Sequence, residues 1–178
     1  MTKQWIQTRL DKKITYFKHK AILNKKYIDR RIDIIDKYAS TYYLDRNELY
    51  GILLLEYLNR GSWITRNTER VFVSLFTRSA INLDLSIGIA QIKISTAKKF
   101  YPSSDFKTLA KKLLIDEFNI HLCAQIMNKY YLSPQKNNKL LGLVKQYTTG
   151  NKNAKENLSI YIYYKLLKWI IEEQYFKS

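Results

Sequence analysis

The stretch that leads to Glu56, with Leu49 and a nearly continuous apolar run from Ile52 to Leu55, constrains the fold more than any other part of the 178-residue chain. Apolar residues nearly surround any helix that this run forms, and a helix of that kind is buried in the middle of a domain. Asp45 or Asn47, just before Leu49, has a side-chain oxygen suited to capping the first turn of a helix. The run therefore predicts the central helix of a small α domain.

Glu56 directly follows the last apolar residue of the run. A carboxylate in that place is expected on or beside a surface that excludes water, which disfavours its charged form and raises its pKa. A raised pKa is what a general acid needs in order to work near neutral pH. The alternative interpretation is an ordinary surface carboxylate at the end of a helix.

Within residues 81 to 93, apolar side chains recur at every second position from Ile81 to Ile89, with polar or small residues between them. This period of two is the pattern of a strand or of one arm of a hairpin, and it puts Asp84, Ser86 and Gly88 on the same face. Gly88 lets the backbone turn or approach a ligand closely, and Gln91 offers both a donor and an acceptor. The segment predicts a small β element with one polar face.

Most of the remaining chain has helical spacing of its apolar residues. Pro102 and Pro134 indicate connections between helices, and Ser95 is expected to cap the helix that follows it. The expected helices are 3–23, 25–39, 63–78, 96–101, 106–114, 116–131, 134–147 and 155–175. The sequence therefore predicts a mainly α protein.

Five pieces of the sequence follow one another in a familiar order: Glu56 after its apolar run, the loop Gly88-Ile-Ala-Gln-Ile92, the helix start Ser95-Thr-Ala97, the pair Asn119-Ile120, and Leu143 to Gly150 with Tyr147 inside it. This order resembles the lysozyme-like lytic transglycosylases and goose-type lysozymes. The resemblance covers residues 45 to 154. Glu56 and Gln91 are 35 positions apart, further than these families usually place them. Residues 57 to 83 are therefore expected to contain an added helix.

The resemblance implies a lysozyme-like α domain over residues 45–178, with a small β-hairpin beside the active-site cleft. Residues 1–44 are expected to be basic helices packed on that domain as part of one structural unit. The implied activity is that of a peptidoglycan glycosidase, which cleaves the β-1,4 bond between N-acetylmuramic acid and N-acetylglucosamine. A lytic transglycosylase is favoured, and a lysozyme-type hydrolase (a muramidase) of the same fold is the alternative.

The resemblance also implies roles for individual residues. Glu56 would be the catalytic acid and then the base, and Gln91 and Tyr147 would bind the substrate near it. Ser86 and Asp84 would line the same cleft, and in a hydrolase Asp84 would help to position water. Asn119 is expected to cap its helix, with contact to a peptide stem of the substrate as the alternative.

The formal net charge of +16 favours a polyanionic partner, and bacterial cell wall, an anionic membrane and nucleic acid are all of that class. Residues 3–23 are interpreted as a basic amphipathic helix that packs on the domain, with electrostatic association to membrane or wall as the sharper interpretation. The competing function is that of a non-enzymatic protein that binds nucleic acid or wall. Nucleic acid is not an obligatory partner, because the basic residues are spread along the chain without a recognition motif.

Other chemistries have little support in the sequence. His19 and His121 are isolated, no cluster has the spacing of metal ligands, and no glycine-rich phosphate loop predicts a cofactor. The single cysteine, Cys123, lies in an apolar helical context and is interpreted as a buried, inert thiol.

The sequence has no signal-peptide pattern at its N-terminus and no stretch long enough to span a membrane. The expectation is synthesis in the cytoplasm and action in the periplasm or cell wall after delivery by another route. A delivery partner, a protein inhibitor, and the choice among antibacterial toxin, phage lysin and housekeeping enzyme all remain open.

Overall fold

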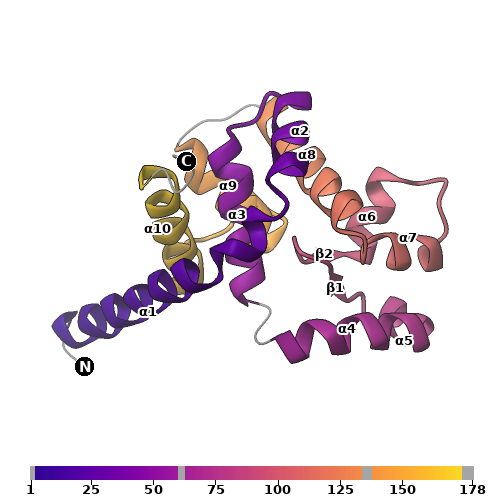
Figure 1. Cartoon of the computed structure of the whole chain (residues 1–178). Helices are drawn as coiled ribbons and strands as arrows, with labels where there is room; N and C mark the ends of the chain where they lie inside the picture. Colours follow the sequence, from indigo (N-terminus) through magenta and orange to yellow (C-terminus); the bar gives the residue numbers. More distant parts are fainter. Residues whose placement is uncertain (1–2, 60–62, 134–137, 174–178) are drawn as a thin grey trace.

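Helix α3, Arg46–Asn59, runs through the middle of the computed structural model, which describes residues 3–59, 63–133 and 138–173 (Figure 1). The Asp45 carboxylate accepts a hydrogen bond of 2.7 Å from the backbone N–H of Asn47, so the predicted cap is confirmed. Every residue from 49 to 55 is buried, and the apolar run lies within this range. The helices that pack against α3 are α1 (Lys3–Asp29), α2 (Ile32–Thr41), α8 (Asp116–Leu132) and α10 (Leu158–Glu172), which confirms the central helix.

Gly51 allows the C-terminal helix α10, Leu158–Glu172, to lie close against α3. A side chain at this position would place its Cβ 2.5 Å from Cδ1 of Leu167, well inside van der Waals contact. Bulkier residues surround Gly51 in the sequence, so it is the point at which the two backbones approach one another. This approach brings the side chains of α10 beside the second half of α3.

The N-terminal segment is one long helix, α1 (Lys3–Asp29), followed by α2 (Ile32–Thr41). The expected break between residues 23 and 25 is wrong. The Asn24 amide donates to the carbonyl of Lys20 at 2.8 Å, and Lys25 pairs with Asp29 at 2.8 Å one turn further on, so local contacts favour the helix at this point. The break falls instead at residues 30 and 31.

The predicted β element is confirmed but is shorter than expected. Strands β1 (Ser86–Ile87) and β2 (Ile92–Lys93) pair antiparallel, with Ser86 opposite Lys93. The expectation of extended chain from residue 81 is wrong, because residues 77–82 form helix α5. The helix α4 (Trp63–Leu75) precedes it, and the two short helices occupy the region where one added helix was expected.

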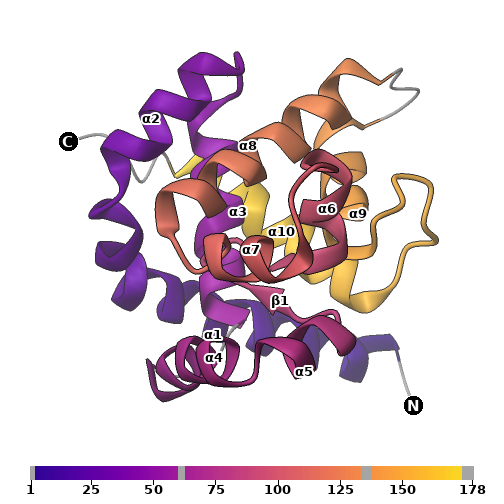
Figure 2. The ribbon, with the colours of Figure 1, turned by 90° about the vertical axis from the view of Figure 1, so that its right-hand side faces the viewer.

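The hairpin lies between two pairs of helices, α4 and α5 on one side and α6 and α7 on the other, as both views show (Figures 1 and 2). Helix α6 spans Ile94–Phe100 and α7 spans Phe106–Lys112. The predicted Ser95 cap is wrong, since α6 begins at Ile94 with Lys93 in the capping position. The hairpin therefore leads without a loop into α6.

Helices α8 (Asp116–Leu132) and α9 (Lys139–Thr149) complete the fold with α10. Asn138 and Asn157 cap α9 and α10 through their side chains. The predicted start of a helix at 134 lies outside the described residues. Within the described residues, the ten helices and one two-stranded sheet form a mainly α protein around one continuous apolar core. The described part of the chain contains no helix with the length and apolarity needed to cross a membrane.

Candidate functional site

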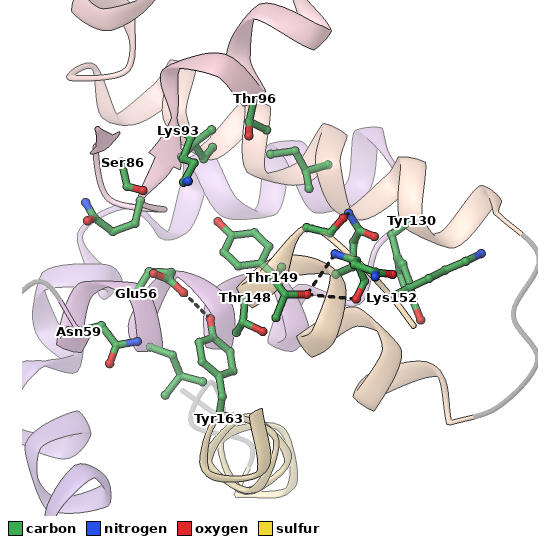
Figure 3. A pocket seen from close by; sticks show the side chains of 18 of the residues that line it. Glu56, Asn59, Ser86, Lys93, Thr96, Tyr130, Thr148, Thr149, Lys152 and Tyr163 are labelled. Atoms are coloured by element: carbon green, nitrogen blue, oxygen red, sulfur yellow. Dashed lines mark hydrogen bonds between the residues drawn. The ribbon is translucent and has the colours of Figure 1, made fainter. Parts of the chain in front are cut away.

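A cavity of about 1270 Å³ opens between the central helix and the hairpin, and Figure 3 shows it from close by. One wall comes from α3 and α10, and the facing wall comes from the hairpin and α6, with α1, α8 and α9 closing the rest. The structure brings all five predicted site residues to this cavity. They are Glu56, Asp84, Ser86, Gln91 and Tyr147.

Glu56 lies near the C-terminal end of α3 with its carboxyl group toward the cavity (Figure 3). Burial raises the pKa of Glu56 from its ordinary value to about 7. Its Oε1 accepts a hydrogen bond of 3.0 Å from the hydroxyl of Tyr163, which works in the opposite direction because it stabilises the charged form. The raised pKa expected from the apolar run is therefore present in the folded chain.

Tyr163 is the cavity residue that sequence reasoning missed. It lies on α10, is buried, and is 107 positions from Glu56 in the chain. Tyr163 and Leu167 are four residues apart and so share one face of α10, and Leu167 is the residue that meets Gly51. A glycine directly before the apolar run was the available signal that another helix packs tightly at this point.

Tyr147 is close to Glu56 but does not bind it directly. Its hydroxyl donates to the carbonyl of Ala90 at 2.6 Å and lies 3.4 Å from Sγ of Cys123. Burial raises the pKa of Tyr147, and the charge of Glu56 raises it further. Tyr147 therefore joins α9 to the loop after β1, and the hydrogen bond to Glu56 comes from Tyr163.

Cys123 is buried, as the sequence predicted. Burial raises the pKa of its thiol to about 12, so the thiolate is scarce at neutral pH. His121, two residues away, instead hydrogen-bonds Tyr42 through Nε2 at 2.7 Å. No Cys–His pair is formed between these residues.

Asn119 holds the tight turn between the two strands. Its Oδ1 accepts from the backbone N–H of Ala90 at 2.7 Å, and its Nδ2 donates to the carbonyls of Ile87 and Leu113 at 2.9 and 3.0 Å. The prediction that Asn119 caps its helix is wrong, and the alternative of contact with a peptide stem is wrong too. The side chain is fully buried and its amide is used by three backbone groups.

Gly88 is required in this turn for two reasons. Its φ is +80°, in the left-handed region that glycine adopts without strain. A Cβ there would lie 2.1 Å from Nδ2 of Asn119 and 2.2 Å from the carbonyl oxygen of Leu113. The backbone turn predicted at Gly88 is therefore confirmed, and its close neighbours are Asn119 and Leu113.

Gln91 is oriented by a carboxylate that the sequence did not single out, Glu69 of α4. Its Nε2 donates to Oε2 of Glu69 at 3.2 Å and to the carbonyl of Gly88 at 2.9 Å. Oε1 of Glu69 accepts from the backbone N–H of Gly88 at 3.1 Å. Both partners of Nε2 are acceptors, so they fix the amide nitrogen and leave the side-chain carbonyl of Gln91, which lines the cavity, available as an acceptor.

Asp84 lines the cavity, but its oxygens are already bonded. Oδ1 accepts from the backbone N–H of Ser95 at 2.8 Å, and Oδ2 accepts from the Ser95 hydroxyl at 2.7 Å. Asp84 thereby satisfies a free N–H in the first turn of α6. Ser86, on β1, is half-buried at the cavity wall.

Among the described residues that line the cavity, positive side chains outnumber negative ones. Its lysines are Lys13, Lys93, Lys99, Lys129 and Lys152. Among the residues that the structure describes, no group of three or more His, Cys, Asp or Glu side chains is arranged to hold a metal ion.

Taken together, these side chains provide a proton donor with a pKa near neutrality, a hydrogen-bond acceptor opposite it, and a positive rim. Such an arrangement can bind an anionic molecule and transfer a proton to it. Within the described part of the chain, the residues that build it come from six helices and the hairpin. No family model matches the chain, and no curated protein or solved structure matches it either.

Proposed function

We propose that this chain is a peptidoglycan glycosidase of the lytic transglycosylase type. It cleaves the β-1,4 bond between N-acetylmuramic acid and N-acetylglucosamine, with Glu56 as acid and then base. The observation that carries the proposal is the Glu56 carboxyl group, which has its pKa raised to about 7 by burial and faces a cavity of about 1270 Å³. At neutral pH such a carboxyl group is present in both protonation states in comparable amounts, as an acid that later acts as a base requires.

In the first step the protonated Glu56 donates its proton to the glycosidic oxygen. The bond between that oxygen and C1 of the muramic acid breaks, the oxygen leaves as a hydroxyl group, and positive charge develops at C1. The Tyr163 hydroxyl donates to the new carboxylate and so stabilises the charge that Glu56 acquires.

In the second step the Glu56 carboxylate removes the proton from the 6-hydroxyl of the same muramic acid. The 6-oxygen forms a bond to C1, which gives a 1,6-anhydro product and returns Glu56 to its protonated state. No water enters this scheme, and one carboxylate carries both proton transfers.

The other cavity residues supply binding. The side-chain carbonyl of Gln91 can accept from an acetamido N–H or a sugar hydroxyl, since Glu69 and Gly88 hold its amide nitrogen. Ser86 can hydrogen-bond the same chain, and Tyr147 shapes the wall beside Glu56. The five lysines at the rim attract the carboxylates of the peptide stems.

The state of Asp84 favours the transglycosylase over a lysozyme-type hydrolase. A hydrolase of this class uses a second carboxylate to position water. Both Asp84 oxygens are engaged by Ser95, which leaves them poorly placed for that role. The proposal includes a lysozyme-like unit over residues 45–178, with residues 1–44 packed on it, because a helix-borne glutamate faces a small hairpin across the cavity.

The test is incubation of wild type and Glu56→Gln with purified peptidoglycan, followed by mass spectrometry of the soluble products. Wild type should release anhydromuropeptides and Glu56→Gln should release none. Glu173→Gln is the matched control, because it removes an exposed carboxylate at the end of α10, outside the cavity. Reducing muramic ends from wild type would replace the transglycosylase with a hydrolase. The absence of soluble product from walls of several chemotypes would refute the glycosidase.

A further inference from the structure

Helix α1 has a buried apolar face and an opposite, exposed face on which large apolar residues lie among lysines. Its inner face buries Leu10, Ala21 and Ile28, and α1 packs with that face toward α3 and α10. Residues on a helix advance by about 100° each. On that spacing Lys12, Tyr16, His19, Ile22, Leu23 and Lys26 share the opposite side, and we call them the outer face.

The outer face is exposed along its whole length. Tyr16, Ile22 and Leu23 have 61%, 49% and 62% of their surface exposed. Large apolar residues scattered singly are ordinary on a protein surface, but these three lie within two turns on one side of one helix. Figure 1 shows the N-terminal part of α1 extending outward from the rest of the ribbon. A flat surface could therefore meet the outer face.

Helix α1 also holds a large share of the net charge. Seven lysines and one arginine against two aspartates leave +6 in its 27 residues, compared with +16 for all 178. Some of these lysines serve the fold: Lys20 donates to the carbonyl of Leu58 at 3.2 Å, and Lys25 pairs with Asp29. Within the described residues Lys12 and Lys26 have no carboxylate partner, so their charges are available at the outer face.

We propose that the outer face of α1 docks on an anionic lipid bilayer, with the helix axis parallel to the membrane surface. Helices of this kind place apolar side chains below the headgroups while lysines remain among the phosphates. The apolar residues favour lipid over wall polymer as the partner. A hydrated polyanion would attract the lysines but would not cover Ile22 and Leu23. The inference does not depend on the glycosidase, since none of the residues of the outer face lines the cavity.

The test is flotation of the full chain with two kinds of vesicle. One is made of phosphatidylcholine alone, and the other of equal parts phosphatidylcholine and phosphatidylglycerol. Wild type should float with the anionic vesicles only. A double variant, Ile22→Ser with Leu23→Ser, keeps the charge and should weaken binding at least about tenfold, because two apolar side chains leave the lipid.

The charge is tested by Lys12→Gln with Lys26→Gln, which should weaken binding about fivefold for each lysine. The matched apolar control is Leu75→Ser with Leu132→Ser, at 71% and 79% exposure on other helices. The matched charge control is Lys107→Gln with Lys111→Gln on α7. Both controls and Glu56→Gln should bind as wild type does, and circular dichroism should show every variant folded, because the changed side chains are exposed.

Three results would overturn the proposal. The first is binding that falls with the lysines but not with Ile22 and Leu23, which is the behaviour of a polymer-binding surface. The second is equal loss in the matched controls, which would reflect total charge or total apolar surface. The third is retention of wild type on insoluble peptidoglycan sacculi with no flotation on either vesicle.

Discussion

At the scale of single residues, the chemistry of the cavity depends on how burial and one hydrogen bond act together on Glu56. Burial raises its pKa, and the Tyr163 hydroxyl lowers it by a smaller amount, which leaves it at about 7. Without Tyr163 the carboxylate would lose a donor and become harder to form. Tyr163 therefore adjusts the pH range over which the proposed acid can act.

Replacing Tyr163 with Phe should shift the pH–rate profile to higher pH. The rate of wild type should fall as pH rises through about 7, because Glu56 then loses the proton that it must donate. Loss of the donated hydrogen bond raises the pKa of Glu56 further, so the falling limb moves up. The profile of kcat/KM against pH measures this shift. The control is Tyr161→Phe, which changes an exposed residue of α10 and should leave the falling limb of the profile at its wild-type pH. A falling limb that does not move in Tyr163→Phe would argue against Glu56 as the group that titrates.

Replacing Glu69 with Gln should weaken substrate binding more than turnover. Both Glu69 oxygens accept, from Gly88 and from Gln91, so an amide at this position sets one donor against another. The Gln91 side chain then loses its fixed orientation. We expect KM to rise several-fold with a smaller change in kcat, as measured by steady-state kinetics on peptidoglycan. A several-fold fall in kcat with an unchanged KM would mean that Glu69 does not position the substrate.

At the scale of elements, the short hairpin is held mainly by a side chain from α8. Two residue pairs make up the whole ladder, which is too little for an independent sheet. Asn119 supplies three hydrogen bonds to the backbone around it, and Tyr147 adds a fourth from α9. The turn therefore keeps its shape only when α8 and α9 are packed in place.

Among the described residues, the two glycines with positive φ, Gly88 and Gly150, separate the effect of backbone strain from that of crowding. Gly150 has φ +73° and open space where a Cβ would be, so Gly150→Ala should destabilise the fold by about 1 kcal/mol. Gly88→Ala adds the collision with Asn119 and Leu113 and should destabilise it by at least about 3 kcal/mol. Urea unfolding of both variants measures the difference. Equal losses of unfolding free energy in the two variants would mean that the turn can open around a Cβ at residue 88 without disturbing Asn119.

At the scale of the whole molecule, the site is built at the expense of stability. A carboxyl group whose pKa is raised in the folded state binds its proton more tightly there than in the unfolded chain. Folding is therefore favoured less as pH rises from the ordinary pKa of 4.5 through about 7. Above that range the charged Glu56 is buried beside α10 and opposes folding.

Glu56→Gln should remove this dependence. Between about pH 5 and pH 8 the wild-type free energy of unfolding should lose up to about 3 kcal/mol through Glu56, since each pKa unit corresponds to about 1.4 kcal/mol. The variant has no ionisable group there and should be the more stable protein at the higher pH. Urea unfolding of both proteins at the two pH values checks this. The same loss of unfolding free energy in wild type and in the variant would mean that other titratable groups cause the pH dependence.

Features that depend on neighbouring residues could be predicted from the amino-acid sequence alone. The central helix follows from the apolar run, because helical periodicity is a property of consecutive residues. The raised pKa of Glu56 follows from the same run, because its apolar neighbours predict a site that excludes water. The mainly α class, the Asp45 cap and the hairpin follow in the same way. The length of the first strand was mispredicted because residues 77–82 form helix α5. The helix break between residues 23 and 25 was mispredicted because local side-chain contacts favour the helix there.

The partners of the site residues depend on how distant elements pack together, and the sequence did not predict them. Tyr163 reaches Glu56 from 107 positions away, Glu69 reaches Gln91 from another helix, and Asn119 turns inward to the hairpin. Asp84 was predicted to border the cleft. In the folded chain both of its carboxylate oxygens also accept hydrogen bonds from Ser95. A hydrogen bond requires atoms within about 3 Å, and periodicity along the chain does not determine which distant helices approach so closely.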